Sequence, residues 1–571
     1  MTTIPINRTK LEALIAAAKQ RAADQKLLAA ACETVANAVE LATLPPALQQ
    51  LTLASGDMTY NEKQTEAINL ALTDASFCLI GAAGTGKTTA VRELCKQLVL
   101  ADKAPLLKED TKMLKAGTPG IVCVSFTNVA VINIARNMQG AVACSTIHSL
   151  LEFSPVDYQL IQEDGSIKHT MRFEPQRNRH NPLPAELTTI VIEEASMVGT
   201  DLFALLLDAL PHANSIQFIV LGDINQLPPV YDTAILGFKM LELPIIELTV
   251  VYRQALLSPI ITLAHDVKNG IIHSEEELRG TKCNVDAGEH GKLTVKPWKK
   301  KLESFTACKL AGDFTKAAID CGEFDPDKDM VLIPFNKEFG TLEFNRYISQ
   351  HLGVKRQAEV FEVIAGYNKH YLAVGDKVLV NKRFGVITRI AKNGSYFGVP
   401  PQESSVHLNR WGYNTDTHAK KAAAAATGSI ADIDALLAAT VDVEDRKLQT
   451  SHLVDVQLEG REHDEMLSTS SEINSMLFAY ALTVHKAQGS EWRRVICFFH
   501  QSHNVMMCRE LLYTAITRAR EELVVVCEPT HFDKAVRTQR IKGDTLAEKA
   551  IYFMGKQADN ERNNPIKEDD Q

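Results

Sequence analysis

The chain has 571 residues, of which 45% are hydrophobic and 23% are charged, and its formal net charge is −9. This length predicts several domains with large buried cores, and the composition is that of an ordinary soluble globular protein. The negative charge excludes a protein coated in positive charge, although an enzyme acting on nucleic acid needs only a local basic track.

The first 55 residues are predicted to form a helical N-terminal extension. The segment from Thr9 to Leu44 is rich in Ala, Leu, Glu, Lys and Gln, which favour helices, and Pro45-Pro46 ends the run.

The most specific motif of the chain is the glycine-rich run Gly81-Ala-Ala-Gly-Thr-Gly-Lys-Thr88. Backbone N–H groups of such a loop approach the phosphates of a nucleotide, its lysine reaches the terminal phosphates, and its threonine hydroxyl can ligate magnesium. The apolar segment 75–80 is predicted to be a buried strand, and residues 89–98 have apolar side chains at helical spacing. Strand, loop and helix follow in the required order, so the sequence predicts binding and hydrolysis of a nucleoside triphosphate.

Two acidic residues follow a second apolar strand. Glu193 and Glu194 come directly after Thr189–Ile192. Next to a phosphate-binding loop, the first carboxylate can hold magnesium, directly or through water, and the second can polarise the water that attacks the γ-phosphate. Downstream, Gln226 follows another expected strand, where its side chain could sense the same phosphate.

Short apolar strands recur between helical stretches from about Tyr60 onward. This alternation predicts an α/β fold with parallel sheets covered by helices, in two sets. Besides the strand before the glycine-rich loop, the expected strands are 120–125, 189–192, 216–221, 330–333, 495–499 and 523–526.

Two stretches interrupt this alternation. In segment 158–173, Asp164-Gly165 lies between strand-like runs, which predicts a protruding β-hairpin. Segment 374–390 has short β-rich runs with turn residues, which predicts a small inserted β-domain, itself interrupted by an Ala-rich helical segment, 422–441. Residues 558–571 have almost nothing to bury, so we expect them to be disordered.

Neither a membrane span nor a secretory signal is expected. No apolar run is long enough to cross a bilayer, and the first ten residues lack an apolar core, so we expect a cytoplasmic protein with no membrane partner. The eleven cysteines include no C-x-x-C pair, and Cys78, Cys123 and Cys497 fall in expected core strands. We therefore expect reduced, buried thiols rather than zinc sites or disulfides.

Further motifs follow one another in a recognisable order. They are Asn61-Glu-Lys-Gln64, Ser125-Phe-Thr-Asn128, Ser145-Thr-Ile-His-Ser149, Val251-Tyr-Arg-Gln254, Leu482-Thr-Val-His-Lys-Ala-Gln-Gly-Ser490 and Tyr513-Thr-Ala-Ile-Thr-Arg-Ala-Arg520. Together with the glycine-rich loop and the paired acids, they make the chain from about Tyr60 to Val526 resemble a superfamily 1B helicase of the RecD and phage Dda type.

This resemblance implies two RecA-like P-loop domains, an inserted β-hairpin that acts as a pin, and an inserted SH3-like β-domain. The implied boundaries are 1–55 for the extension, 56–250 for the first core domain with the hairpin at about 152–186, 251–370 and 471–550 for the second core domain, 371–470 for the SH3-like insert, and 551–571 for a flexible tail.

The resemblance also implies roles at an ATP and Mg²⁺ site. Gln64 would read the adenine edge, Thr88 and Glu193 would hold magnesium, and Glu194 would be the catalytic carboxylate. The other nucleotide-site residues would be Gly81, Gly84, Thr85, Gly86, Lys87, Thr89, Gln226, Gly489 and the two arginines that reach across from the second core domain, Arg253 and Arg518. A guanidinium suits the last role because it spreads positive charge over phosphoryl oxygens. Arg520 lacks such support and is expected on the surface.

One residue departs from the pattern of the family, which usually has Asp where this chain has Glu193. The extra methylene moves the carboxylate by about 1.5 Å, which disturbs a direct magnesium contact more than a water-mediated one. We expect a working site whose turnover is tuned by this substitution.

The remaining motifs are expected to line a single-stranded nucleic-acid path that contacts backbone phosphates without reading sequence. Its candidate residues are Phe126, Thr127, Asn128, Thr146, His148, Pro228, Thr483 and His485. Phe126 would stack a base or belong to the core, two alternatives of equal weight. Each histidine alone fits an ordinary hydrogen-bonded residue better than a catalytic one.

The function that the resemblance implies is an ATP-dependent DNA helicase, moving 5′ to 3′ as a monomer on single-stranded and forked DNA, with replication or recombination proteins as partners. Two alternatives stay open at this point. One is a helicase acting on RNA, because phosphate contacts do not identify the sugar. The other is a nucleic-acid-stimulated ATPase that acts as a switch or translocase without unwinding.

Overall fold

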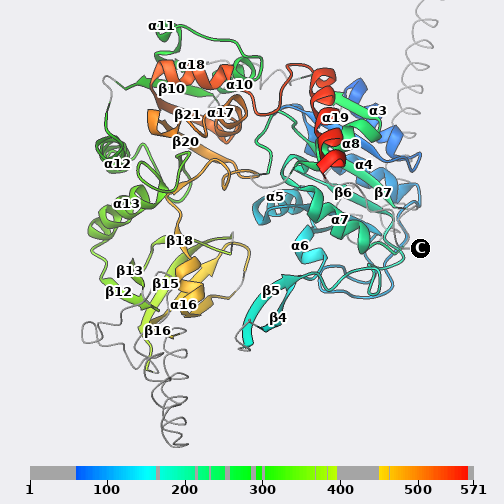
Figure 1. Cartoon of the computed structure of the whole chain (residues 1–571), viewed down its shortest axis with the longest axis horizontal. Helices are drawn as coiled ribbons and strands as arrows, with labels where there is room; N and C mark the ends of the chain where they lie inside the picture. Colours follow the sequence, from blue (N-terminus) through cyan, green and yellow to red (C-terminus); the bar gives the residue numbers. More distant parts are fainter. Residues whose placement is uncertain are drawn as a thin grey trace, which may run out of the picture.

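The computed structural model in Figure 1 describes residues 60–161, 167–211, 216–229, 233–250, 258–283, 291–298, 302–366, 368–381, 383–394, 449–461 and 463–563. Two α/β domains lie side by side, and a β-rich unit lies below the second of them. The expected N-terminal helices, the hairpin tip at Asp164-Gly165, Arg253 and the Ala-rich segment lie outside the described residues.

The first domain is built on a six-stranded, wholly parallel sheet with the order β3-β2-β6-β7-β1-β8. Its strands are β1 (Phe77–Gly81), β2 (Ile121–Ser125), β3 (Ala143–Thr146), β6 (Thr189–Ile192), β7 (Gln217–Gly222) and β8 (Ile245–Leu248). The four inner strands confirm the prediction. The two edge strands were not predicted, because they are short and only partly buried and so lack a continuous apolar run.

Successive residues of the inner strands feed two cores, one on each face of this sheet. Phe77 and Leu79 point to the core under one set of helices, and Cys78 and Ile80 to the other core. The first face is covered by α3 (Glu62–Ala71), α4 (Lys87–Leu100) and α5 (Asn128–Met138), and the second by α6 (Ile147–Leu150), α7 (Thr200–Asp208) and α8 (Ile235–Glu242).

A hairpin of β4 (Ser154–Ile161) and β5 (Ile167–Glu174) projects from the first domain, directly after α6 (Figure 1). The two strands pair antiparallel from Ser154↔Glu174 to Ile161↔Ile167 and form a sheet of their own. The predicted protruding hairpin is therefore present within the expected range of 152–186.

The second domain contains a six-stranded sheet with the order β19-β11-β20-β21-β10-β9, parallel except for β9. Its strands are β9 (Gly280–Cys283), β10 (Lys292–Pro297), β11 (Met330–Leu332), β19 (Ala481–Leu482), β20 (Trp492–Phe499) and β21 (Ala519–Cys527). The predicted strands became β11, β20 and β21, which confirms the second parallel set.

Helices cover both faces of the second sheet as well. On one face lie α10 (Pro259–Lys268), α17 (Arg509–Ile516) and α18 (Pro529–Arg537), and on the other α12 (Ser304–Asp320) and α13 (Thr341–Arg356). The second domain also has the short helices α11 (Glu275–Leu278) and η4 (Gln501–His503), and the first domain has η1 (Ala195–Met197) after β6. Cys78, Cys123 and Cys497 are buried and unpaired, as predicted.

The β-rich unit is a seven-stranded antiparallel sheet whose main path is β13-β12-β16-β15-β14-β18, with β17 paired to β16. Its elements are β12 (Val360–Ala365), β13 (Asn368–Ala373), β14 (Lys377–Val380), β15 (Arg383–Lys392), β16 (Gln449–Leu458), β17 (Glu465–Thr469), α16 (Ser470–Ser475) and β18 (Leu477–Phe478).

The expected boundary of this insert at residue 371 is wrong. It falls inside β13, whose partner β12 begins at Val360, so the sheet starts eleven residues earlier. Only two residues of β12 are buried, but five of its six residues, Val360-Phe-Glu-Val-Ile-Ala365, are apolar, so the sequence did carry a strand signal that the expected boundary left out.

The C-terminal part of the described chain returns to the first domain as α19 (Leu546–Asn563), which packs against α8 (Figure 1). The expectation of a flexible tail beginning at 551 is therefore wrong for residues 551–563. Phe553 is buried, and its ring lies edge-on to Phe238 with the centroids 5.7 Å apart. Leu546 and Tyr552 of α19 also pack against this core, and composition alone did not reveal these few apolar contacts in a polar segment.

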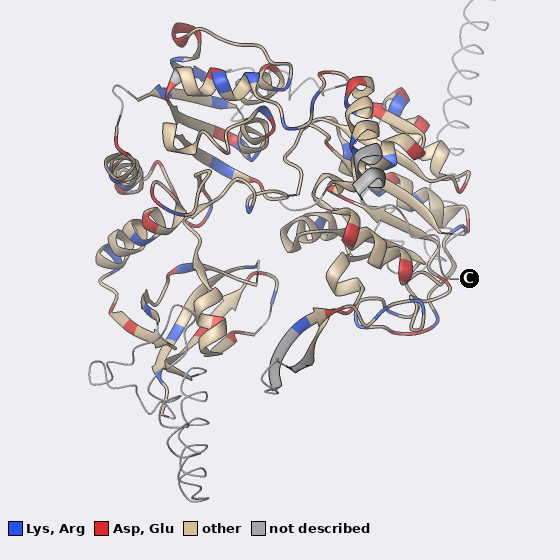
Figure 2. Cartoon of the chain, in the orientation of Figure 1, with Lys and Arg blue, Asp and Glu red and all other residues tan. Residues whose placement is uncertain are grey.

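Charges of both signs are interspersed over both domains in Figure 2, which agrees with the absence of a positive coat. Within the described residues, no helix is both long and apolar enough to cross a membrane.

Candidate nucleotide site and nucleic-acid path

The glycine-rich loop joins β1 to α4 in the first domain. Gly84 and Gly86 have left-handed backbones, with φ values of 79° and 77°, which side chains other than glycine rarely adopt. Gly86 is the N-cap of α4 and offers no side-chain cap, so the first N–H groups of this helix are available to an anion. Gly81 is needed for space, because a Cβ there would lie 2.5 Å from Oγ1 of Thr85.

The lysine of the loop binds the loop itself. Nζ of Lys87 donates to the carbonyl oxygens of Gly81 at 2.6 Å and Ala82 at 3.2 Å. The Thr85 hydroxyl is buried and also donates to Ala82, at 2.9 Å. Thr88 and Thr89 are partly exposed in the first turn of α4. The predicted phosphate-binding residues therefore form one loop with cationic and N–H donors.

Gln64 lies beneath this loop and is fully buried. Its side chain forms a capping box with Asn61 at the start of α3, and its Nε2 donates to the carbonyl oxygen of Gly86 at 3.3 Å. The amide thus supports the backbone of the loop, and its expected reading of adenine stays a prediction.

The paired acids lie at the end of β6, and each has an unusual environment. Burial, followed by the charge of Glu194, raises the pKa of Glu193 to about 7, against the opposing charge of Lys87. Glu194 has a left-handed backbone with φ 52° and ψ 44°. Such strain in a residue other than glycine is costly, and it clusters at functional sites.

Several side-chain oxygens at this edge of the sheet are buried and have no hydrogen-bond partner within the described residues. Among them are Oε1 of Glu193, Oε2 of Glu194 and Oε1 of Gln226. Buried oxygen atoms without partners are expensive, and a hard cation with its waters satisfies them. The Glu193 carboxylate and the Thr88 hydroxyl are oxygen ligands of the kind that suits Mg²⁺. No group of three or more His, Cys, Asp or Glu residues that could hold a metal occurs in the described part of the chain. The protein would therefore supply only a few of the ligands of a Mg²⁺ ion.

The second domain contributes Arg518, which follows the C-cap of α17, Thr517, and is 3% exposed. Its guanidinium donates to the carbonyl oxygens of Thr514 at 3.0 Å and Ser490 at 3.1 Å, and to the hydroxyl of Thr517 at 3.0 Å. All of these partners are neutral, and no carboxylate among the described residues pairs with the guanidinium. Arg520, expected on the surface, is exposed.

Polar contacts join the two domains beside the nucleotide loop. The hydroxyl of Tyr513 on α17 donates to Oδ2 of Asp223 at 2.5 Å, and the backbone N–H of Ala83 donates to that hydroxyl at 3.2 Å. Leu227 takes part through both backbone groups, its N–H donating to Oγ1 of Thr514 at 3.0 Å and its carbonyl accepting from Nε2 of Gln488 at 2.7 Å. Neither Tyr513, which begins the motif Tyr513–Arg520, nor Asp223 was predicted as a site residue.

Gly489 belongs to the same contact between domains. Its φ is 77°, and a Cβ there would lie 2.9 Å from Oγ1 of Thr127 at the start of α5. Its carbonyl accepts from Nδ2 of Asn133 in α5 at 3.1 Å. The structure thus places this predicted nucleotide-site residue against α5.

The predicted nucleic-acid residues of the first domain gather where two adjacent strands end. Ser125 of β2 pairs with Thr146 of β3, so α5 and α6 start side by side. Thr127 caps α5 by accepting from the N–H of Ala130 at 3.3 Å, and Thr146 caps α6 in the same way. Asn128 is the first residue of α5. Hydroxyl and N–H groups of these helix starts suit backbone phosphates.

Three aromatic rings run beside these helix starts. The ring of His148 lies 5.7 Å from that of Phe126 and 5.0 Å from that of Phe153, centroid to centroid. Phe126 packs against the core of the first domain and is only partly buried. Both alternatives for it, core and stacking, are compatible with this position.

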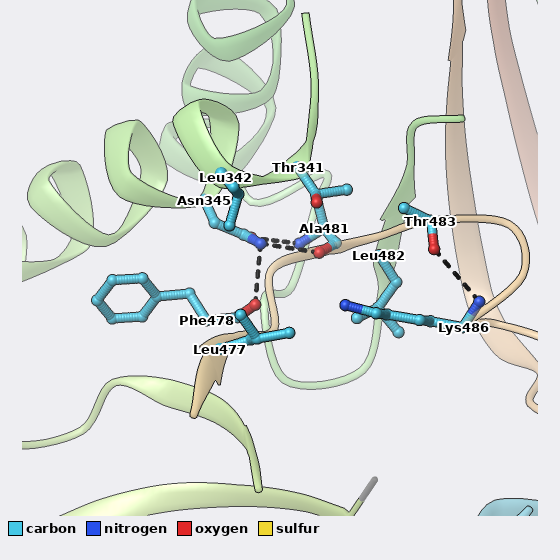
Figure 3. A pocket seen from close by; sticks show the side chains of 9 residues that line it. All are labelled: Thr341, Leu342, Asn345, Leu477, Phe478, Ala481, Leu482, Thr483 and Lys486. Atoms are coloured by element: carbon cyan, nitrogen blue, oxygen red, sulfur yellow. Dashed lines mark hydrogen bonds between the residues drawn. The ribbon is translucent and has the colours of Figure 1, made fainter. Parts of the chain in front are cut away.

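In the second domain, Thr483 and Lys486 line a small pocket with residues of α13, β18 and β19, shown in Figure 3. Oγ1 of Thr483 accepts from the N–H of Lys486 at 3.3 Å, and the Lys486 side chain extends into the pocket. Its ammonium has no partner within the described residues, and burial lowers its pKa. Asn345 fixes the opposite wall by donating to the carbonyl oxygens of Phe478 and Ala481, both at 2.9 Å.

Two further candidates for the nucleic-acid path are His485, between Thr483 and Lys486, and Pro228 of the first domain. Burial, then the charge of Arg540, lowers the pKa of His485 to about 4, so its imidazole is neutral at physiological pH. Pro228 follows Gln226 and Leu227 in the loop that contacts the second domain and is partly exposed.

Each of the two domains has sequence relatives among known proteins. A family described as an AAA domain matches residues 64–232, and one described as a UvrD-like helicase C-terminal domain matches residues 478–526. The ATP-dependent RecD2 DNA helicase of Deinococcus radiodurans is 28% identical over 382 residues, which are 66% of this chain and 41% of that protein. The RecBCD enzyme subunit RecD of Mycobacterium tuberculosis is 23% identical over 499 residues, covering 85% of this chain and 72% of that protein.

The chain thus spans about two fifths of the first of these relatives. Among solved structures, the Pif1 helicase from Candida albicans is 15% identical, with 88% of this chain and 100% of that chain covered and a TM-score of 0.40.

Proposed function

We propose that this chain, a RecD-like relative of the superfamily 1B helicases, is an ATP-dependent DNA helicase that moves along single-stranded DNA. One observation carries the proposal. The phosphate loop of the first domain meets α17 of the second, which contacts Ala83 through Tyr513 and holds the unneutralised Arg518 nearby. A nucleotide site made by two domains converts binding and hydrolysis into relative motion.

The residues of the first domain divide the chemistry of ATP hydrolysis. Lys87 exchanges its loop carbonyls for phosphate oxygens, while the N–H groups at the start of α4 cradle the same phosphates. Thr88 and Glu193 would hold Mg²⁺, which when bound neutralises developing charge on the phosphates. Glu194 orients and deprotonates the attacking water, and Gln226 contacts the γ-phosphate.

The second domain supplies positive charge as the transition state forms. Arg518 is held by neutral partners and keeps its full charge for the phosphoryl oxygens. We assign Arg253 the same role from its motif alone, and Gly489 closes the contact between the domains.

A single DNA strand would cross both domains on the side where these motifs gather. The helix starts at Thr127 and Thr146 provide phosphate contacts in the first domain, and Thr483 with Lys486, whose ammonium has no partner in the described part of the chain, provides them in the second. None of these groups reads a base edge, which suits a motor indifferent to sequence. Phe126 and His148 offer rings for stacking, and Pro228 and His485 line the same path.

We further propose that the β4–β5 hairpin is the pin that splits the duplex and that the β-rich insert is SH3-like. The hairpin follows α6 directly, so it stands next to the strand path. Movement from 5′ to 3′, action as a monomer on forked DNA, and a part in replication, recombination or repair with proteins of those processes complete the proposal.

The test is unwinding of a short DNA duplex that carries either a 5′ or a 3′ single-stranded tail, with ATP and magnesium. Unwinding from the 5′ tail only, abolished in Lys87→Ala, supports the helicase and its direction. Unwinding from the 3′ tail only refutes the direction. Failure on both tails with DNA-stimulated ATPase intact favours the switch or translocase, and stronger stimulation by RNA than by DNA favours an RNA helicase.

A further inference from the structure

Tyr513 links three segments through one buried hydroxyl. The residue lies on α17 of the second domain and is fully buried. Its hydroxyl donates to Asp223 at the end of β7 and accepts the N–H of Ala83 in the phosphate loop. The only bond between the second domain and the phosphate loop recorded for the described residues therefore passes through a single oxygen atom.

Both carboxylate oxygens of Asp223 are also engaged in hydrogen bonds. It is fully buried, its Oδ2 accepts from Tyr513, and its Oδ1 accepts from the backbone N–H and the side-chain amide of Asn225, both at 3.0 Å. The carbonyl oxygen of Asp223 also accepts from the N–H of Gln226 at 3.1 Å. Tyr513 thus touches the loop that carries the expected γ-phosphate contact as well as the loop that binds the phosphates.

The proton of this hydroxyl stays on the tyrosine. Burial, together with the negative charge of Asp223, raises the pKa of Tyr513 well above its usual value. Both hydrogen bonds are directional and desolvated, so they exist only while the domains keep this separation.

We propose that Tyr513 is the positioning residue that couples the nucleotide state of the phosphate loop to the position of the second domain. Movement of Ala83 or Asp223 when a nucleotide binds shifts α17, and with it Arg518 and the segment from Thr483 to Gly489. The inference rests on the proposed function, since it assigns the route by which ATP and single-stranded DNA affect each other's binding.

The chain contains a matched control for this proposal. Tyr480 is 2% exposed, its hydroxyl donates to Oδ1 of Asp376 at 3.1 Å, and it accepts the backbone N–H of Lys377 at 3.1 Å. The two tyrosines therefore make the same two kinds of bond. Those of Tyr480 lie between the second domain and its insert, away from the phosphate loop.

The experiment measures the affinity of the full chain for a fluorescent oligo-dT by anisotropy, with and without a non-hydrolysable ATP analogue. The ratio of the two dissociation constants is the coupling, which is typically about 5- to 150-fold in allosteric systems. In Tyr513→Phe we expect the ratio to fall towards one, while the nucleotide-free affinity stays within about twofold. In Tyr480→Phe we expect the ratio of the unchanged protein, with a comparable loss of Tm.

A second variant keeps the test sharp if Tyr513→Phe folds poorly. Asp223→Asn can satisfy either Asn225 or the proton of Tyr513 but not both, so it should also lower the ratio. The double variant should be no worse than the stronger single one, because both remove the same interaction.

An unchanged ratio in Tyr513→Phe overturns the inference, and so does an equal fall in Tyr513→Phe and Tyr480→Phe, which would mean general loosening. These outcomes leave the proposed function standing if tailed duplexes are still unwound by the unchanged protein. Absence of unwinding and of ATP turnover in the unchanged protein refutes the proposed function, and the inference falls with it.

Discussion

The ring of Phe553 in α19 lies against the backbone of Gly237 in α8, so closely that a Cβ on the glycine would be 2.2 Å from the ring. We therefore expect Gly237→Ala to displace α19 and lower the Tm. Phe553→Ala should cost about 3–5 kcal/mol of unfolding free energy, as large core aromatics do. Urea unfolding of both single variants and the double variant checks this. Additive losses would contradict direct packing, because the glycine clash exists only with the ring.

Arg518→Lys is expected to lower kcat for ATP hydrolysis by about a thousandfold, because lysine keeps the charge but not the planar fork that several neutral partners hold. The exposed Arg520→Lys is the control and should turn over ATP normally. Steady-state ATPase assays with oligo-dT compare the two variants. Similar losses in both, or none in Arg518→Lys, would remove Arg518 from the catalytic site.

Glu193→Asp tests whether the longer carboxylate tunes the magnesium site. We expect the variant to change kcat several-fold and to shift the magnesium dependence, because the shorter side chain moves the carboxylate by about 1.5 Å. Titrating ATPase activity with magnesium at saturating ATP measures both effects. If turnover and magnesium dependence are both unchanged, the substitution has no tuning role.

Shortening the β4–β5 hairpin is expected to lower duplex unwinding by about tenfold or more while DNA-stimulated ATPase stays within about twofold. The change replaces residues 159–169 with a two-residue turn and keeps the described pairs from Ser154↔Glu174 to Tyr158↔Thr170. Equal loss of both activities would argue that the hairpin supports the domain rather than splitting DNA.

His503 predicts an acid-sensitive contribution to stability. Burial lowers the pKa of His503 to about 4, and its ring bonds to the N–H of His500 and the carbonyl of Phe339 at 3.1 and 2.7 Å. The unfolded state, with a pKa near 6.5, therefore binds more protons than the folded state at intermediate pH. The contribution is present above pH 6.5 and is lost as the pH falls towards 4, by about 3 kcal/mol in all.

The variant His503→Asn should be less stable than the unchanged protein at pH 7.5, and the difference should shrink steadily between pH 6.5 and 4.5. Urea unfolding across this range measures it. A difference that is constant with pH would mean that His503 does not titrate as inferred.

The first sheet and the phosphate loop were predictable from the sequence because their signals are local. A continuous apolar strand, a glycine run and a helix fix the position of Lys87, and an apolar strand fixes that of Glu193. The left-handed backbone of Glu194 was not predictable, because nothing in its residue type requires it.

Contacts between segments that are distant in the chain could not be predicted from the sequence. Tyr513 and Ala83 are separated by 430 positions, and only the relative placement of two domains brings them together. Likewise, the short runs of β3 and β8 pair as strands only because the sheet places an edge beside them, and neither run is long enough to announce a strand by itself.

The docking of α19 makes the second domain an insertion in the first. The polypeptide leaves the first domain after β8, builds the second sheet and its β-rich unit, and returns to α8 with some of its last described residues. During synthesis on a ribosome, the apolar face of α8 stays uncovered until α19 has been made, after the strands of both sheets. The two domains thus mature together rather than in turn, and a chain truncated before residue 546 would display that face to chaperones.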